Sequence, residues 1–201
     1  MTDKNDEIKS NVEDLTLYSP NHPFNLSLRI RNFENEKEFI KFVKNCELLI
    51  RKCAEYRLWK NYITDILQQT SCVITDESMD ELTVEIHHHI PSLFVLVKSI
   101  VSKYLAKNEE FSSFEIALEG IKLHFQNKIG YIPIISSLHE KFHNGFLDIP
   151  VSLVKGNYMQ YLTEYSEYID QDDMDTIDKR MATNENNCIW TSNNYLHRAE
   201  G

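Results

Sequence analysis

Two short stretches, Cys72-Val-Ile-Thr75 and Leu82-Thr-Val-Glu-Ile-His87, decide the predicted fold class. Both are rich in β-branched residues, which favour extended strands. The acidic segment Asp76 to Glu81 separates them, so the two stretches are predicted to pair as an antiparallel hairpin. Helical patterns dominate on either side. The sequence therefore predicts a mainly α fold with a small antiparallel β-hairpin, of the α+β class.

The predicted helices have recognisable starts and stops. Asn35 with Glu38 forms an N-x-x-E start, after which apolar residues recur at helical spacing as far as Cys53. Later helices are expected from Pro91 to about Ala106, from Ser112 or Ser113 to Asn127, over residues 134–144 and from Tyr158 to Ile169. Gly145 is suited to end the helix over 134–144.

Length and composition predict one globular domain with appendages. The 201 residues are 42% hydrophobic and 26% charged. Residues 1–28 are predicted to form a flexible N-terminal arm, residues 29–169 a single helical domain bearing the histidine-rich hairpin, and residues 170–201 an acidic, Asn-rich C-terminal tail. We expect no membrane span and no signal peptide, and hence a cytoplasmic location with reduced cysteines.

The net charge of −10 is concentrated at the two ends of the chain. Residues 1–28 carry −3 and residues 164–201 carry −6, whereas residues 29–163 are close to neutral at −1. A neutral middle can still present a local basic face. The helix after Asn35 places five cations opposite its apolar face, which makes them weak candidates for binding nucleic acid or, alternatively, a solvated surface: Lys37, Lys41, Lys44, Arg51 and Lys52.

Five of the eight histidines fall into two groups. His87, His88 and His89 are consecutive at the predicted end of a strand, and His139 and His143 lie four residues apart on a predicted helix. Residues at that spacing share one helix face. A helical pair with a donor from a strand end supplies three ligands to a transition metal and leaves a position open. The alternative is that His139 and His143 are surface residues without a ligand.

The segments Val84-Glu-Ile-His-His-His89 and Tyr131-Ile-Pro-Ile-Ile-Ser-Ser-Leu-His-Glu-Lys-Phe-His-Asn-Gly145 together resemble the HNH endonucleases. The likeness covers about residues 72–149 and implies a ββα-metal element with a helical insertion. It implies that His87 is a metal ligand and His88 the general base, with His139 and His143 completing the metal site. A shift of one residue would give the first two roles to His88 and His89. The asparagine of that family aligns with Gly130.

The resemblance implies a divalent-metal-dependent endonuclease that cleaves phosphodiester bonds in nucleic acid. A neutral imidazole can take the proton of the attacking water while a cation stabilises the departing oxygen. The metal would be Zn²⁺, Ni²⁺, Mn²⁺ or Mg²⁺, and a shell of histidines favours the softer ions.

A second resemblance rests on His139-Glu140-Lys141-Phe142-His143, which matches the H-E-x-x-H pattern of zinc metalloproteases. It implies that Glu140 is a general base and that Glu164 is a candidate third zinc ligand.

The chain also resembles uncharacterised proteins of large bacteriophages, in its histidine-rich strand end and its late H-E-x-x-H-N-G. This gives a non-catalytic alternative, in which the histidines hold a structural or degenerate metal site. The acidic ends and the tyrosine-rich helix from Tyr158 to Ile169 would then bind a host or partner protein, in the host cytoplasm. A nuclease requires His87 or His88 close to His139 and His143, whereas a binding protein is expected to expose an apolar patch.

Overall fold

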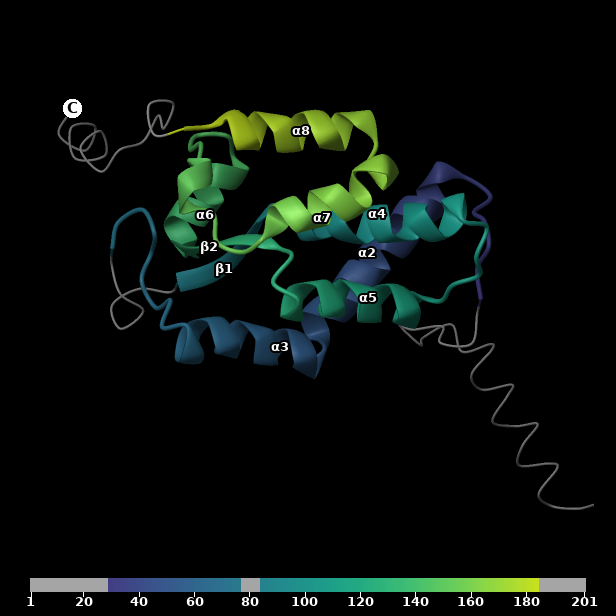
Figure 1. Cartoon of the computed structure of the whole chain (residues 1–201), viewed down its shortest axis with the longest axis horizontal. Helices are drawn as coiled ribbons and strands as arrows, with labels where there is room; N and C mark the ends of the chain where they lie inside the picture. Colours follow the sequence, from purple (N-terminus) through teal and green to yellow (C-terminus); the bar gives the residue numbers. More distant parts are fainter. Residues whose placement is uncertain (1–28, 77–83, 185–201) are drawn as a thin grey trace, which may run out of the picture.

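The computed structural model describes residues 29–76 and 84–184 (Figure 1). These residues form a mostly helical fold around a two-stranded sheet, as predicted. The predicted arm, residues 1–28, lies outside the described residues. The elements are α2 (Glu36–Lys52), α3 (Ala54–Asn61), the π-helical turn η1 (Tyr62–Ile66), β1 (Val84–Ile90), α4 (Leu93–Ala106), α5 (Ser113–Phe125), β2 (Gly130–Ile135), α6 (Ser136–His143), α7 (Tyr158–Tyr165) and α8 (Gln171–Ala182), with 3-10 turns η2 (Val151–Leu153) and η3 (Ser166–Tyr168).

Several helix ends follow the local signals in the sequence. The side chain of Asn35 accepts a hydrogen bond of 3.0 Å from the backbone N–H of Glu38 at the start of α2. Ser112 and Glu115 form a reciprocal capping box at the start of α5. Gly145, with φ of 72°, follows α6 in the left-handed region that glycine tolerates.

Strand β1 does not pair with the segment predicted for it. It pairs antiparallel with β2, with His87 opposite Ile132. Residues 73–75 form a turn instead of a strand, although the Val73 N–H still donates to the Pro133 carbonyl at 3.0 Å. All six residues of β2 are buried, so this pairing places β1 against the apolar core. The predicted hairpin partner, Cys72–Thr75, was therefore wrong, while the fold class is confirmed.

The strands and α6 follow one another in the order strand, strand, helix. Helices α4 and α5 lie between β1 and β2 in the sequence, and α6 starts directly after β2. This confirms the ββα order with a helical insertion. It also brings α6 beside both strands, as Figure 1 shows, although α6 lies some fifty residues after β1.

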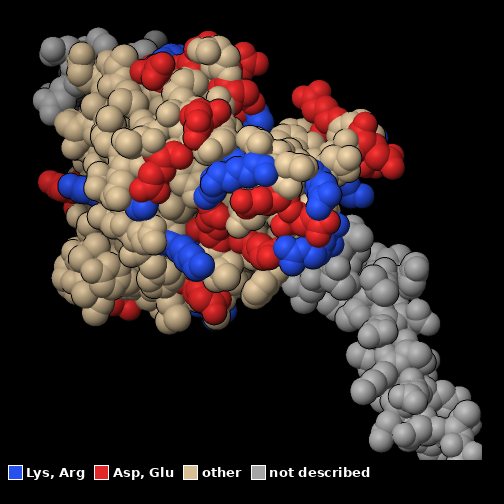
Figure 2. All heavy atoms as spheres, turned by 45° about the vertical axis from the view of Figure 1, so that its right-hand side comes forward, with Lys and Arg blue, Asp and Glu red and all other residues tan. Residues whose placement is uncertain are grey.

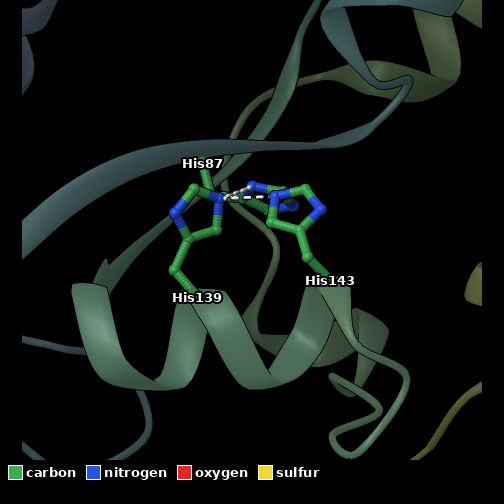
Figure 3. A group of neighbouring side chains, drawn as sticks. All are labelled: His87, His139 and His143. Atoms are coloured by element: carbon green, nitrogen blue, oxygen red, sulfur yellow. Dashed lines mark hydrogen bonds between the residues drawn. The ribbon is translucent and has the colours of Figure 1, made fainter.

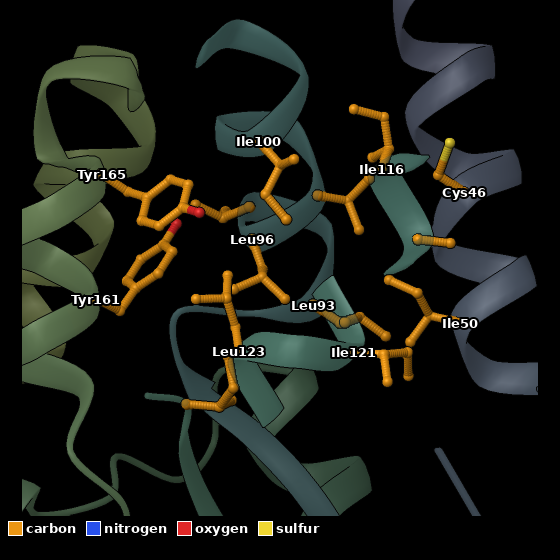
Figure 4. Packing of buried hydrophobic residues seen from close by; sticks show 14 of the residues in the cluster. Cys46, Ile50, Leu93, Leu96, Ile100, Ile116, Ile121, Leu123, Tyr161 and Tyr165 are labelled. Carbon is orange, nitrogen blue, oxygen red and sulfur yellow. The ribbon is translucent and has the colours of Figure 1, made fainter. Parts of the chain in front are cut away.

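The main core lies where α2, α4, α5 and α7 meet (Figure 4). Ile50, Leu96 and Ile100 are fully buried there, and each such side chain contributes about 2 kcal/mol to stability. Gly120 allows α5 to approach α2 closely, because a Cβ at that position would lie 2.7 Å from Cδ1 of Ile50. A smaller apolar cluster, which includes Ile132, Ile134 and Leu138, supports β2 and α6.

The predicted tail begins at residue 170, but the structure continues as a folded helix. Asp170 caps the start of α8, and Ile177 of this helix is buried. Lys98 of α4 donates to the Asp173 carboxylate at 2.7 Å and so fixes α8 to the core. Residues 185–201 lie outside the described part of the chain.

The tyrosine-rich helix is an internal element. Tyr161 is fully buried and Tyr165 is 4% exposed, and their rings stack with centroids 5.0 Å apart. The Tyr161 hydroxyl lies 2.7 Å from that of Ser99 in α4. These two side chains therefore pack the core and are not available to the partner protein that the sequence suggested. Among the described residues, no helix is long and apolar enough to cross a membrane.

Candidate metal centre

Successive side chains of strand β1 point to opposite faces of the sheet, as in any β-strand. Glu85, His87 and His89 lie on the face toward α6, with the rings of His87 and His89 6.1 Å apart. His88 lies on the other face, against α3 and α5. The triplet is thereby divided between two environments.

Three histidine rings converge between β1 and α6 (Figure 3). Nδ1 of His87 lies 2.7 Å from Nε2 of His139, and Nε2 of His143 lies 2.8 Å from that same atom. One ring nitrogen from each residue lies within 4.8 Å of the other two. The helical pair and the strand end therefore meet as the spacing predicted.

Glu85 supports the cluster from the side. Its Oε2 lies 2.7 Å from Nδ1 of His139, and its Oε1 accepts a hydrogen bond of 2.7 Å from the Ser136 hydroxyl. The hydrogen bonds from Ser136 and from His139, together with the His139 charge, lower the pKa of Glu85 although its partial burial opposes this. Because Nδ1 of His139 contacts the Glu85 carboxylate, Nε2 of the same ring is the nitrogen directed at the other two histidines.

The protein environment disfavours the charged form of the two flanking rings. Burial, with the nearby His139, lowers the pKa of His87 to about 2. Burial and the charges of His139 and Arg180 lower the pKa of His143 as well. Neutral imidazoles have the lone pairs that a metal ion requires.

The three histidines form one wall of a cleft of about 730 Å³. Arg51 and Lys60, from α2 and α3, also line it. The cleft gives the cluster access to solvent, although His87 itself is only 7% exposed.

His88 lies apart from this group in an aromatic box. Its ring stacks on Tyr56 with centroids 5.9 Å apart, and lies 5.5 Å from the ring of Trp59. Its Nε2 lies 2.8 Å from Nε2 of His124, and both histidines are buried. This environment lowers the pKa of His88 well below its usual range, through burial first and His124 second.

One comparison with known proteins gives a match. The residues 2–198 fit the family of bacteriophage G278-like virion proteins. The chain belongs to that family. No match was found among curated proteins or among solved structures.

Membership of a virion protein family contradicts the HNH-like endonuclease hypothesis. The structure agrees at two positions. His88, the predicted general base, is only 5% exposed, and its ring lies on the face of β1 opposite to His87, where its Nε2 contacts His124 instead of the three-histidine group. Gly130, which aligns with the asparagine of the HNH family, has no room for a side chain, because a Cβ there would lie 2.6 Å from the Ile90 carbonyl oxygen. The shifted assignment to His88 and His89 is not reflected in the three-histidine group, which contains His87 and neither of these residues.

The protease hypothesis also lacks its third ligand in this virion protein. Glu164 forms an ion pair with Lys128 at 2.7 Å, and it is absent from the cluster. The third residue beside His139 and His143 is His87. Glu140 is an exposed residue of α6 and forms no part of the three-histidine group.

The cations of α2 remain a surface feature of this virion protein. The side chains concerned are all exposed, and Arg51 pairs with Glu47 of its own helix at 2.8 Å: Lys37, Lys41, Lys44, Arg51 and Lys52. On the face drawn in Figure 2, lysine and arginine alternate with aspartate and glutamate, and no continuous basic surface lies on that face. A role for these cations in binding nucleic acid stays a prediction.

Sequence reasoning missed Glu85 as a member of the site. The signal was present, because Glu85 precedes His87 by two residues and the strand period of two places both on one face. The same period places His88 on the face opposite to His87. It was therefore sufficient to predict that the three consecutive histidines lie on two faces of the strand.

Proposed function

We propose that this virion protein is a structural component that contacts another virion protein through an apolar surface on α5, α3 and η1. Family membership supports a role in the particle. The observation that carries the proposal is the composition of the exposed face of α5.

The exposed positions of α5 are occupied mainly by large apolar side chains. Phe114 is 54% exposed, Leu118 43% and Phe125 54%. With 3.6 residues per turn, these positions fall within about 40° of one another on the helix. Lys122 is the fourth exposed residue of α5. A solvated helix face is normally polar, so this arrangement favours a surface that another protein covers.

The apolar surface continues onto the neighbouring elements α3 and η1. Phe125 lines a second cleft of about 550 Å³ together with Tyr62 and Leu67, which are 48% and 41% exposed. Leu58 and Ile66 are also exposed, at 60% and 67%. Exposed apolar groups that extend over several elements are typical of protein–protein contacts.

The partner is expected to present a complementary apolar face with few charges at its centre. Burying a charge without a partner is costly, and interfaces exclude charged residues from their cores. A glutamate placed in the α5 surface should therefore prevent docking without disturbing the fold, since the side chain it replaces is half exposed.

Incorporation of variant protein into phage particles tests this proposal. Leu118→Glu is expected to reduce the amount of the chain in purified particles at least tenfold, measured by quantitative mass spectrometry. Leu48→Glu is a matched control, because Leu48 is 44% exposed and lies on α2 opposite the buried Cys46 and Ile50. Circular dichroism of both purified variants verifies folding. Equal incorporation of Leu118→Glu and wild type would overturn the proposal.

A further inference from the structure

We propose that His87, His139 and His143 bind one late first-row transition-metal ion of the Zn²⁺ class, and that this ion fastens α6 to β1. The site is separate from the apolar surface on α5. Three ring nitrogens converge there, and one of them, Nε2 of His139, lies at hydrogen-bond distance from both of the others.

The three rings cannot all be satisfied by hydrogen bonds to one another. Nδ1 of His139 contacts the Glu85 carboxylate at 2.7 Å, so only Nε2 of that ring is left to meet the other two histidines. Two ring nitrogens, from His87 and His143, lie at 2.7 and 2.8 Å from that atom. A ring nitrogen has one in-line position, which holds either one proton or one lone pair, so Nε2 of His139 cannot form both contacts as in-line hydrogen bonds and one of them is unsatisfied. A cation among the three lone pairs resolves the conflict.

The dimensions of the cluster fit such an ion. A tetrahedral ion with Zn–N bonds of 2.0–2.1 Å holds its nitrogens ~3.3 Å apart. The two short contacts must lengthen by about half an ångström, and the third nitrogen pair is already within 4.8 Å. Small side-chain rotations of His139 and His143 at the rim of the cleft provide this change.

The donor set selects the kind of metal. Three neutral imidazoles suit Zn²⁺, Ni²⁺ or Cu²⁺, whereas Mg²⁺ and Ca²⁺ prefer oxygen ligands. The three histidines line the cleft together with Arg51 and Lys60, so the cleft would supply a water molecule as the fourth ligand of a tetrahedral ion. Glu85 acts on the metal through His139, as carboxylates commonly do behind metal-bound histidines.

The ion would hold a weakly anchored helix. Helix α6 has eight residues, and only Leu138 among them is buried. An isolated helix of this length is marginal in water. Its metal-binding residues, His139 and His143, are joined through the ion to His87 of β1, which is 52 residues earlier in the chain.

Metal titration of the purified full chain, without a polyhistidine tag, tests the site. The metal-free protein is titrated with Zn²⁺ by calorimetry and with Co²⁺ by visible spectroscopy, with Mg²⁺ as a comparison. We expect one Zn²⁺ per chain, an intense tetrahedral Co²⁺ spectrum and no Mg²⁺ binding. His143→Ala, at an exposed position, should abolish both signals, and Glu85→Gln should weaken Zn²⁺ binding roughly 10–100-fold.

Glu140→Gln is the matched control, because Glu140 is exposed on the same helix and next to His139 in sequence. It should bind Zn²⁺ as wild type does. Zn²⁺ binding that survives in His143→Ala, or the absence of any stoichiometric binding by the folded wild type, would overturn the proposal. The assay needs no partner protein, so its result is independent of the proposed docking role.

Discussion

Each face of strand β1 carries a histidine that contacts histidine side chains of a helix. The two groups differ in how their hydrogen bonds are satisfied and in their access to solvent. On one face, His88 and His124 are enclosed by Tyr56 and Trp59. Nδ1 of His124 donates to the Gly120 carbonyl at 2.6 Å, so its Nε2 accepts from His88. Each of these contacts has one donor and one acceptor, and the pair is complete without a ligand.

On the other face, Nε2 of His139 contacts both His87 and His143, which is one contact more than a ring nitrogen can make in line, and a cleft reaches the three residues. The Glu85 carboxylate already contacts Nδ1 of His139, so that nitrogen cannot relieve the crowding at Nε2. The comparison teaches that histidine clustering alone does not indicate a ligand site. The number of contacts at each ring nitrogen and access to solvent distinguish the packed pair of His88 and His124 from the group of His87, His139 and His143.

Disrupting the pair of His88 and His124, called here the closed pair, should have the largest effect on stability. His124→Ala leaves a cavity beside Trp59, whose ring centroid lies 4.6 Å away, and leaves the His88 N–H without its acceptor. We expect the free energy of unfolding to fall by about 3–5 kcal/mol. Urea denaturation of the metal-free protein measures this. His143→Ala is the control and should cost less than about 1 kcal/mol, because His143 is exposed. Similar losses in the two variants would contradict the comparison.

Metal should stabilise the protein only through the group of His87, His139 and His143, called here the open trio. At a free Zn²⁺ concentration a hundred times the dissociation constant, the free energy of unfolding is expected to rise by about 2.7 kcal/mol. His143→Ala should lose this increment, and the His124→Ala variant, although weakened, should retain it. Thermal unfolding of the three proteins with and without Zn²⁺ measures the effect. Loss of the increment in His124→Ala would show that the two faces act as one site.

The closed pair should also make stability depend on pH. Burial lowers the pKa of His124 to about 4, with the Gly120 carbonyl opposing and the charge of Arg51 assisting. Between pH 6.5 and 4 the unfolded chain therefore binds a proton that the native chain excludes, and stability falls as pH falls. From pH 7 to pH 5 this one residue should cost about 2 kcal/mol.

Denaturation of metal-free protein across pH 5–7 measures this dependence. In a folded His124→Gln variant, the stability lost between pH 7 and pH 5 should be about 2 kcal/mol smaller than in wild type. Glu140→Gln should keep the pH dependence of wild type. An unchanged slope in His124→Gln would mean that His124 does not resist protonation. The groups that face His124 are His88, Tyr56 and Trp59.

Much of this architecture could be predicted from local sequence signals. Asn35, Ser112 and Gly145 mark helix ends through hydrogen bonds and backbone angles that involve only near neighbours. The spacing of His139 and His143 likewise fixed their common face. The partner of β1 could not be found in this way, because pairing with β2 depends on burial of a strand forty residues away that no local pattern reports.

The function was harder to derive because similar residues serve different chemistry. The motif around His139 and His143 gave a likeness to nucleases, and the geometry of His87, His139 and His143 does converge as that likeness implied. The burial of His88 and the tight packing at Gly130 depend on tertiary contacts with Tyr56, Trp59 and Ile90. The family match, which covers nearly the whole chain, outweighs a motif of a few residues.

The smallest predicted effect sharpens the comparison at the edge of the open trio. Ser136→Ala removes the hydrogen bond of 2.7 Å to Oε1 of Glu85, which is one of the interactions that keep this carboxylate ionised and oriented toward His139. We expect a loss of about 0.5–1 kcal/mol in stability and a weakening of Zn²⁺ binding smaller than that of Glu85→Gln, measured by calorimetry. Ser137→Ala, an exposed neighbour, is the control. If Ser136→Ala weakened binding as much as Glu85→Gln, the carboxylate would owe its position mainly to this hydroxyl, and the role assigned to the His139 contact would be too large.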